Sequence, residues 1–445
     1  MMHPTDYSKK VASAQEILKK VLFEGANVVY GNAATCPDAF NQALFDSRDS
    51  IPRINIFHVL YYGKALHMTQ EMNGKVRTFC NFMEKQAREA YAQGLVDFFP
   101  CHFHEVPSLF TLGYYSPDIT VMQVAPPDEE GYCSFGLSCD YTKTAAELAK
   151  VVVAEVNPQM PRVGGRKNAI HLSQIDHIIE VDRPVIAVPP AKIGELEAKI
   201  GAFVASLIGD GATLQLGIGA IPDAVLSNLE DRKDLGIHTE MFSDGVMNLM
   251  KKGVITGGRK ELHPGKVVSA FITGTKELYD FVDDNEEVEL YPVDYTNDPF
   301  NIAKISNFVA INSAIEVDLF GQGNAESIGP RLFSGSGGQV DFLRGTKKSK
   351  GGFSVLALPS TAAGGKVSRI VPRLTPGALV TSVRNDVDYV VTEYGIARMR
   401  GKTMAERARD LIRIAHPQFK EELEDFARRE IGYFKTLYHK KYTRK

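Results

Sequence analysis

Apolar residues along the chain follow two spacings, one typical of helices and one typical of short buried strands. Between Tyr7 and Leu22 they recur every three or four positions, which predicts an amphipathic helix. Ala26–Tyr30 then forms a short apolar run, which predicts a buried strand. Strands of the same type are predicted at Ile54–Leu60, Asp118–Val124, Val151–Val156, Thr213–Leu216, Val267–Phe271, Phe308–Asn312, Ser354–Leu358 and Tyr389–Thr392. Apolar strands separated by helical connections favour an α/β fold with largely parallel sheets.

A proline-rich stretch marks the predicted domain boundary. Pro189 and Pro190 end a short apolar run, and a helical pattern resumes at Gly194. A chain of 445 residues is too long for one ordinary core. We therefore expect two domains, residues 1–188 and 189–445.

The C-terminal part has its own pattern. From Met404 to Phe434 it is rich in Glu, Arg, Leu and Phe at helical spacing, which predicts two helices on the second domain. The basic end, Tyr438–Lys445, is predicted to be a frayed tail.

Two stretches of the chain repeat one pattern. EGANVVYGNAATCPDAFNQAL (Glu24–Leu44) aligns with DGATLQLGIGAIPDAVLSNL (Asp210–Leu229) after a gap of one residue. Both read as Gly-Ala, strand, glycine turn, Pro-Asp-Ala and helix. Further on, Leu60 falls where Glu240 falls in the second half. The halves therefore look like diverged copies, with a carboxylate only in the second; chance similarity of strand-turn-helix units is the alternative.

Composition narrows the classes of function. The chain is 44% hydrophobic and 24% charged with a net charge of −3, as in a globular protein that has no general attraction to nucleic acid or anionic membranes. No stretch approaches the roughly 18 apolar residues of a membrane span, and the start lacks an apolar segment, so a cytoplasmic location is expected. The cysteines are odd in number and lack a Cys-x-x-Cys pair, so they are interpreted as free thiols: Cys36, Cys80, Cys101, Cys133 and Cys139.

The first candidate for chemistry is a glycine turn in LGIGAIPDAV (Leu216–Val225). A predicted strand runs into the turn, and a helix could begin near Pro222. Without side chains the backbone can approach a ligand, and the amides of Gly217–Ile221 could hold a phosphate or an oxyanion. Pro222 stands where the dinucleotide-binding pattern has its third glycine, which disfavours that pattern. An ordinary strand-to-helix turn is the structural alternative.

The second candidate is HTEMFSDGV (His238–Val246), which places Glu240 and Asp244 just after a predicted strand. In a nicotinamide enzyme such a carboxylate would bind a ribose hydroxyl, and in an acyl-transfer enzyme it would be a nucleophile. A solvated or helix-capping side chain is the usual role of a lone glutamate.

A second glycine cluster, FSGSGGQVDF (Phe333–Phe342), contains Gly335, Gly337 and Gly338, which weaken both helices and strands. A flexible surface hairpin is the structural alternative. Carboxylate attack on a thioester needs a shielded but ionised glutamate, amides aimed at the thioester oxygen, and a groove for a long phosphorylated cofactor. The three motifs together could supply all of these.

With the motifs above, FHEVPSL, YPVDYTNDP and VVTEYGIARMRGK resemble the acetyl-CoA hydrolase/transferase family, and within it the 4-hydroxybutyrate and butyryl-CoA:acetate CoA-transferases. The similarity runs from about Gly25 to about Leu423. It implies two similar α/β domains with the active site between them, and a homodimer or higher homo-oligomer.

Carried over residue by residue, the resemblance implies that Glu240 forms a glutamyl-CoA thioester and that the amides of Ile221 and Gly338 form an oxyanion hole. The implied CoA-binding residues are Gly217, Ile218, Gly219, Ala220, Ile221, Asn312, Ser334, Gly337, Gly338 and Lys366.

The implied reaction is ping-pong transfer of CoA from acetyl-, butyryl- or succinyl-CoA to butyrate, 4-hydroxybutyrate, acetate or an itaconate-like acid. It would need no metal, no ATP and no cofactor besides CoA as substrate. An acyl-CoA hydrolase using the same glutamate is the alternative, and an NAD-dependent dehydrogenase is a more distant one.

The identity of the acid stays open, because Leu60–Glu84 departs from the pattern of the hydroxybutyrate enzymes. Tyr61, Tyr62 and His67 could reach the acyl site, although a packed aromatic turn is the favoured interpretation. Candidate partners for a second carboxylate on the acid are Arg53, Lys64 and Arg77.

One further cluster, Cys101, His102, His104 and Glu105, could ligate a metal, but nothing in the sequence completes the ligand set. We expect a cleft-lining or structural role instead. Glu393 could support the site from behind, and a structural ion pair is an equal alternative.

Overall fold

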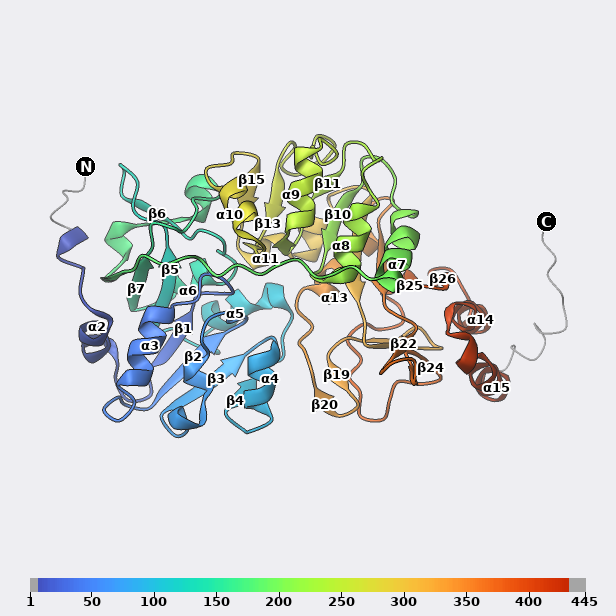
Figure 1. Cartoon of the computed structure of the whole chain (residues 1–445), viewed down its shortest axis with the longest axis horizontal. Coiled ribbons are helices and arrows are strands. Elements are labelled where there is room, and N and C mark those ends of the chain that lie inside the picture. Colours follow the sequence, from blue (N-terminus) through green and yellow to red (C-terminus); the bar gives the residue numbers. More distant parts are fainter. Residues whose placement is uncertain (1–6, 432–445) are drawn as a thin grey trace. The chain divides into compact units, whose positions relative to one another are not determined.

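The computed structural model describes residues 7–431 (Figure 1), which form two compact units. The first unit comprises Met1–Pro189, Ile237–Met247 and His263–Asp298, and the second comprises Pro190–Gly236, Asn248–Leu262 and Pro299–Lys445. The predicted tail from Tyr438 to Lys445 lies outside the described residues.

The division differs from the predicted one, because the chain returns to the first unit after the boundary near Pro189. Residues 237–247, which carry Glu240, were expected in the domain 189–445 but belong to the first unit. The physical reason is strand pairing and burial. β12 (Met241–Phe242) pairs with β14 (Phe271–Ile272), and residues of both strands share an apolar core with Phe57 and Phe110.

The first unit is built on a seven-stranded sheet of order β4-β3-β2-β1-β5-β7-β9, in which every neighbouring pair is parallel. Val28 on β1 lies opposite both Ile56 on β2 and Ile119 on β5, and the side chains of β5 are all buried. The strands are β1 Asn27–Tyr30, β2 Ile54–His58, β3 Val76–Cys80, β4 Val96–Phe98, β5 Ile119–Val124, β7 Val151–Val156 and β9 His177–Glu180.

Helices cover this sheet, and the smaller elements of the unit lie around it. Figure 1 shows α2 and α3 beside β1, and apolar residues of both helices share one core with β1 and β2. The helices are α2 Ala14–Val21, α3 Asp38–Asp46, α4 Lys85–Tyr91, α5 Val106–Thr111, α6 Thr142–Leu148, α10 Lys276–Val282 and α11 Val293–Thr296. Short strands are β6 Tyr132–Ser134, β8 Ala169–His171, β13 Val267–Ser269 and β15 Val288–Leu290.

The second unit is built on a six-stranded sheet of order β11-β10-β16-β21-β25-β26. The pairs from β10 to β25 are parallel, and β26 is antiparallel to β25. Its strands are β10 Thr213–Leu216, β11 Gly236–Ile237, β16 Phe308–Ser313, β21 Phe353–Ala357, β25 Tyr389–Thr392 and β26 Gly395–Arg398. Its helices are α7 Glu195–Ala205, α8 Ala220–Ser227, α12 Pro299–Ile302, α13 Gln339–Lys348, α14 Met404–Ile414 and α15 Lys420–Glu430, and α9 Asp244–Lys251 spans the boundary between the units.

The two predicted C-terminal helices are present as α14 and α15. Leu411 and Leu423 are buried in the core of the second unit, and α14 lies beside β26 in Figure 1.

The two large sheets share one strand order. In the first, β2-β1-β5-β7-β9 follow each other, and in the second β11-β10-β16-β21-β25 do. Both therefore read 2-1-3-4-5 when numbered along the chain, once β3 and β4 of the first sheet and β26 of the second are set aside. This order supports the predicted duplication, and it places a topological switch point between the first and third strands of each sheet.

One predicted helix is shorter than expected. The pattern predicts a helix over residues 7–22, but α2 begins only at Ala14 because the Ser13 hydroxyl accepts a hydrogen bond from the amide of Glu16. The Glu16 carboxylate in turn accepts from the amide of Ser13, which completes a capping box and fixes the helix start.

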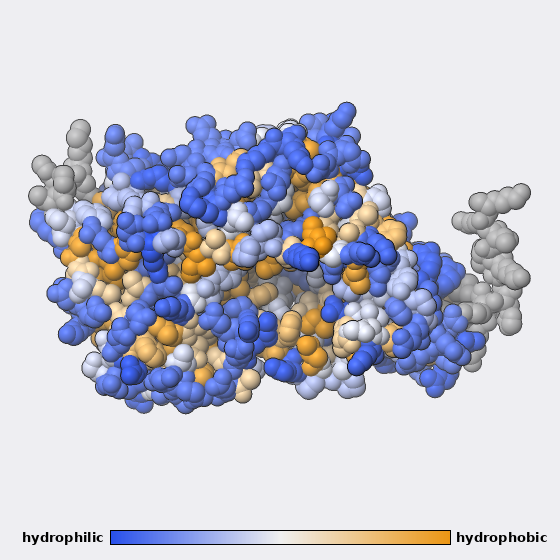
Figure 2. Space-filling view, in the orientation of Figure 1, coloured by the Kyte–Doolittle hydropathy of each residue, from blue (hydrophilic) through white to orange (hydrophobic). Residues whose placement is uncertain are grey.

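Hydrophilic residues cover most of the face seen in Figure 2, with apolar patches between them. Within residues 7–431, the helices are too short or too polar to cross a lipid bilayer.

Candidate functional site

The first glycine turn connects β10 to α8 in the second unit. Gly219 has φ +115° and ψ −178°, a backbone conformation that is open in practice only to glycine. A Cβ atom added at Gly217 or at Gly219 would meet no atom within 4 Å. Packing therefore does not require these two glycines, and the space in front of the turn is open.

The start of α8 leaves backbone amides available at this turn. The first helical hydrogen bond runs from the amide of Asp223 to the carbonyl of Gly219 (3.1 Å), so the amides of Ala220 and Ile221 precede the helical ladder. No side chain caps this helix start. The helix begins at Ala220, two residues before the predicted start at Pro222, because proline fits anywhere in a first turn where no amide is needed.

The second glycine cluster also ends in a helix start. Gly338 is the N-cap residue of α13, and Gly337 has φ +50°. The amide of Phe342 donates to the carbonyl of Gly338 (3.1 Å), which opens the helix. The flexible hairpin considered as an alternative is therefore replaced by a turn with a fixed geometry.

Both helix starts lie at the carboxyl edge of the second sheet. α8 follows the carboxyl end of β10, and α13 runs back toward the amino end of β21, so its own start lies at the carboxyl edge. Asn312 near the end of β16 exchanges two hydrogen bonds with Gln215 on β10 (2.9 and 3.2 Å). Since β10 and β16 flank the switch point, this is the place where doubly wound sheets bind ligands.

The remaining predicted ligand contacts belong to the same unit. Ser334 lies ahead of α13 and is half-buried, and Lys366 is exposed in the turn between β22 (Thr361–Ala362) and β23 (Val367–Ser368). The structure therefore gathers the predicted glycine turn and its accompanying residues in the second unit, while Glu240 belongs to the first.

Glu240 lies between His238 and β12, and its backbone is held tightly. Its carbonyl oxygen accepts hydrogen bonds from the amides of Ala270 (3.0 Å) and Phe271 (3.1 Å) and from the hydroxyl of Ser269 (3.0 Å). Its side chain is half-buried.

Asn297 fixes the Glu240 carboxylate. Its Nδ2 donates to Oε2 of Glu240 at 2.8 Å, and its own side chain is fully buried. Asn297 follows α11, and His238 Nε2 lies 2.8 Å from the carbonyl of Thr296 in that helix. The motifs HTEMFSDGV and YPVDYTNDP, far apart in sequence, therefore meet at the carboxylate.

Sequence reasoning missed Asn297. The motif YPVDYTNDP contributed only to the resemblance, and the spacing of 57 residues from Glu240 carried no local signal.

The histidine cluster packs near this group. The 3₁₀ helix Phe103–Glu105 contacts α11, and the His102 and His104 rings stack with centroids 6.2 Å apart. Within the part of the chain that the structure describes, no three His, Cys, Asp or Glu side chains gather as a metal-ligand group. The cluster contacts α11, the helix that Asn297 follows.

Tyr61 and His67 pack together in an aromatic turn, which is the interpretation that the sequence favoured. Tyr61 is fully buried, His67 is 2% exposed, and their ring centroids are 4.8 Å apart. His67 Nε2 lies 3.1 Å from Nε2 of His58, and burial lowers the pKa of His58 to about 3. Both imidazoles are therefore neutral.

Two proposed partners for a second carboxylate are already paired. Arg53 binds Glu24 (2.5 Å), and Arg77 binds Asp97 (2.9 Å).

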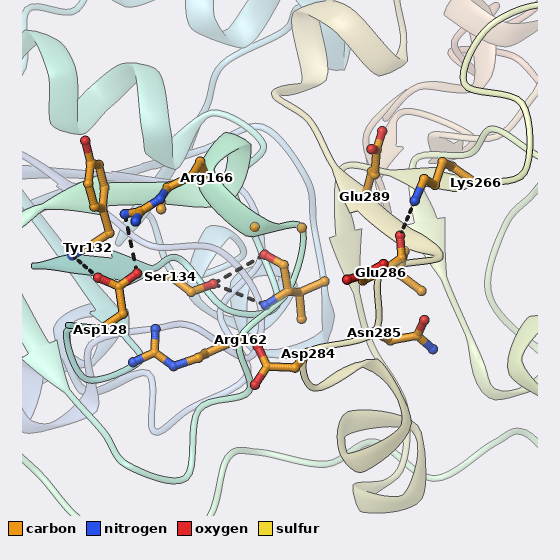
Figure 3. A pocket seen from close by; sticks show the side chains of 15 residues that line it. Asp128, Tyr132, Ser134, Arg162, Arg166, Lys266, Asp284, Asn285, Glu286 and Glu289 are labelled. Atoms are coloured by element: carbon orange, nitrogen blue, oxygen red, sulfur yellow. Dashed lines mark hydrogen bonds and ion pairs between the residues drawn. The ribbon is translucent and has the colours of Figure 1, made fainter. Parts of the chain in front are cut away.

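A pocket of about 570 Å³ lies elsewhere in the first unit (Figure 3). Its cations already have partners: Arg166 lies 3.4 Å from Asp128, Lys266 donates to the backbone of Glu286 (2.7 Å), and Arg162 donates to a backbone carbonyl. No predicted site residue lines this pocket.

Comparison with known proteins gives one consistent result. The model of the acetyl-CoA hydrolase/transferase N-terminal domain matches residues 1–190, and that of the C-terminal domain matches residues 274–427. The chain is 51% identical to the 4-hydroxybutyrate coenzyme A transferase of Clostridium kluyveri, over 94% of this chain and 97% of the relative. It is 38% identical to the butyryl-CoA:acetate CoA-transferase of Anaerostipes caccae, over 95% and 97%. The crystal structure of 4-hydroxybutyrate CoA-transferase from Porphyromonas gingivalis is similar with a TM-score of 0.83 and 52% identity, over 96% of this chain and 99% of that one.

The geometry of the Gly217–Ile221 turn predicts that replacing its two glycines with alanine will affect stability differently. Gly219→Ala should lower the free energy of unfolding by about 1–3 kcal/mol, because alanine cannot adopt φ +115° without strain. Gly217→Ala should change it by less than about 0.5 kcal/mol, because its φ is not positive and its Cβ meets open space. Chemical denaturation of both variants measures this, and equal losses would contradict the assigned geometry.

The buried carboxyl of Glu84 should make the stability of the protein depend on pH. Burial raises the pKa of this carboxyl from 4.5 to about 7, so the neutral acid stabilises the fold below pH 4.5 and this contribution is lost as the pH rises through 7. Glu84→Gln cannot ionise, so between pH 5 and pH 8 it should gain on the wild type by about 2–3 kcal/mol. Unfolding free energies at several pH values measure this; parallel profiles would refute the buried acid.

Proposed function

The chain belongs to the acetyl-CoA hydrolase/transferase family, and we propose that this CoA-transferase passes CoA between small carboxylic acids through a covalent intermediate on Glu240. The predicted resemblance is confirmed by the family matches and by relatives named for CoA transfer.

The observation that carries the proposal is the hydrogen bond between Asn297 and Glu240. A nucleophilic carboxylate must be oriented, and it must keep one oxygen lone pair directed at the substrate. The amide of Asn297 binds Oε2 at 2.8 Å and comes from a fully buried side chain, so it fixes the rotation of the carboxylate. A neutral donor also stabilises the ionised form without neutralising it.

In the proposed mechanism, Glu240 attacks the thioester carbonyl of an acyl-CoA. The oxyanion is bound by the backbone amides of Ile221 and Gly338 at the two helix starts, where partial positive charge gathers. Collapse of the tetrahedral intermediate breaks the C–S bond and gives an acyl-glutamyl anhydride and CoA thiolate.

The thiolate then attacks the glutamyl carbonyl and expels the first carboxylate, which leaves a glutamyl-CoA thioester on Glu240. The incoming acid repeats these steps in reverse order. One thioester replaces another, so the reaction requires neither ATP nor a metal ion. Two accessible steps replace one difficult step, and the kinetics should be ping-pong.

For the CoA ligand, we propose the edge of the second sheet near Gly217–Ile221, with Asn312, Ser334, Gly337, Gly338 and Lys366. The open space before the first turn supports this assignment. For the acids, we propose short monocarboxylates such as 4-hydroxybutyrate, butyrate and acetate, for which the relative of 51% identity and the butyryl-CoA:acetate CoA-transferase are named.

Removing the nucleophile tests the proposal. Glu240→Gln should lower transfer between butyryl-CoA and acetate by at least about 10³-fold, because the amide cannot attack the thioester. Intact-mass spectrometry after incubation with acyl-CoA should show a CoA adduct on the wild type and none on the variant. The control Glu287→Gln changes an exposed glutamate of the same unit and should retain activity.

Normal turnover by Glu240→Gln would refute the mechanism. The same wild-type assay without an acceptor acid separates transfer from hydrolysis: a transferase releases little free CoA, whereas rapid release would favour an acyl-CoA hydrolase that uses the same glutamate.

Changing Asn297 should affect the pH profile. Asn297→Asp places a second carboxylate beside Glu240, and like charges raise the pKa of such a pair. The acidic limb of kcat/KM should therefore move to higher pH, and further than in Asn297→Ala, which only removes a donor to the carboxylate and should lower kcat about 10- to 100-fold. An unshifted profile in Asn297→Asp would show that the two side chains do not interact during catalysis.

A further inference from the structure

Arg369 is an arginine of the second unit whose side chain has no protein partner. Its Nε atom is buried and makes no hydrogen bond, and within residues 7–431 its guanidinium forms no ion pair. Buried donors in native proteins are almost always satisfied, so the unsatisfied Nε of this half-buried side chain indicates a partner that binds from outside the chain. Burial also lowers the pKa of Arg369, which reflects the cost of holding this charge without a direct counter-ion.

The acid that interacts electrostatically with Arg369 is Glu393, and its carboxylate is hydrogen-bonded to another residue. Glu393 interacts with Arg369 only at longer range. Both of its carboxylate oxygens are taken by Ser360, whose amide donates to Oε2 (2.8 Å) and whose hydroxyl donates to Oε1 (2.5 Å). The alternative of a structural ion pair for Glu393 is therefore replaced by a serine-bound carboxylate.

The backbone holds Arg369 in this position. Its amide donates to the carbonyl of Ser360 (2.8 Å), and its carbonyl accepts from the amide of Val317 (2.8 Å). The residue stands between β23 and β24 (Ile370–Val371), and β24 pairs with β17 (Glu316–Asp318). The unpartnered guanidinium is thus presented by a fixed segment.

The position lies along the edge proposed for CoA. Ser360 follows the carboxyl end of β21, and Glu393 follows that of β25, the second and third strands beyond β10 in the sheet. With strands about 4.8 Å apart, these ends are roughly 10–14 Å along the edge from the first glycine turn. A ligand whose thioester lies at that turn would extend its distal part toward Arg369.

We infer that Arg369 binds a phosphate group of CoA. CoA carries a diphosphate and a ribose 3′-phosphate, and the planar fork of a guanidinium matches phosphate oxygens with two parallel hydrogen bonds. A phosphate oxygen would supply the missing partner of the Nε donor. This inference rests on the proposed function.

Three acyl-donor substrates distinguish which phosphate Arg369 binds. They are acyl-CoA, acyl-dephospho-CoA, which lacks the 3′-phosphate, and the acyl thioester of pantetheine, which has no phosphate. Arg369→Gln should weaken binding of CoA at least about 10-fold by calorimetry, and should raise KM for acyl-CoA by a similar factor. Turnover of the pantetheine thioester should equal that of the wild type. If Arg369→Gln also weakens the binding of dephospho-CoA, Arg369 binds the diphosphate. If the variant binds dephospho-CoA as well as the wild type does, Arg369 binds the 3′-phosphate.

Two variants act as controls. Arg369→Lys keeps the charge but loses the fork, so its affinity for CoA should fall between those of the wild type and Arg369→Gln. Arg398→Gln removes an exposed arginine near the amino end of β25, at the opposite edge of the same sheet, and should bind CoA normally.

Several outcomes would overturn the inference. They are unchanged CoA affinity in Arg369→Gln, an equal loss with the pantetheine thioester, or a raised KM for the acceptor acid alone, which would assign a carboxylate ligand. If the wild type itself bound no CoA, the proposed function would fail instead.

Discussion

The backbone carbonyl of Glu240 is the group on which the placement of this proposed nucleophile depends. Three donors from consecutive residues, Ser269 to Phe271, converge on this one oxygen. They tie the loop after β11 to β14, and Met241 and Phe271 are buried in one core. Because the tie is made by backbone and a short hydroxyl, the position of Glu240 does not depend on the long side chains around it.

The two large sheets share one strand order, but the turn at the switch point is closed in the first sheet and open in the second. Gly31 follows β1 as Gly217 follows β10, but a Cβ at Gly31 would lie 2.7 Å from the carbonyl of Thr35. At Gly217 the same atom would meet nothing within 4 Å. The turn after β1 is also closed by a hydrogen bond from the amide of Ala33 to the carbonyl of Leu60. The turn at the first switch point is thus packed against protein, whereas the space before the turn at the second is open.

The sequence alone predicted the helices and strands whose signals are local. Continuous apolar runs predicted β5 and β7 correctly, because both strands are buried on both faces. It missed β3 and β4, which carry exposed Arg77 and Asp97 and lie at the edge of the sheet, where polar residues interrupt the pattern. It missed Asn297 for a different reason, since its role arises from a contact that only the folded chain makes. The return of residues 237–247 to the first unit likewise follows from pairing with a distant strand, which no local pattern records.

Glu240 and the segment Leu60–Glu84 are held in place by different kinds of interaction. Glu240 and the two helix starts are fixed by backbone hydrogen bonds and helix geometry, so their function tolerates changes in neighbouring side chains. The segment Leu60–Glu84 is held instead by side-chain packing: Tyr62 packs against the core that contains Met241 and Phe271, and burial raises its pKa to about 12. Burial likewise raises the pKa of Glu84 to about 7, so both side chains lie in a weakly polar environment. Under the proposed function, substitutions in this segment can change which acid is accepted while Glu240 and its supporting hydrogen bonds stay in place.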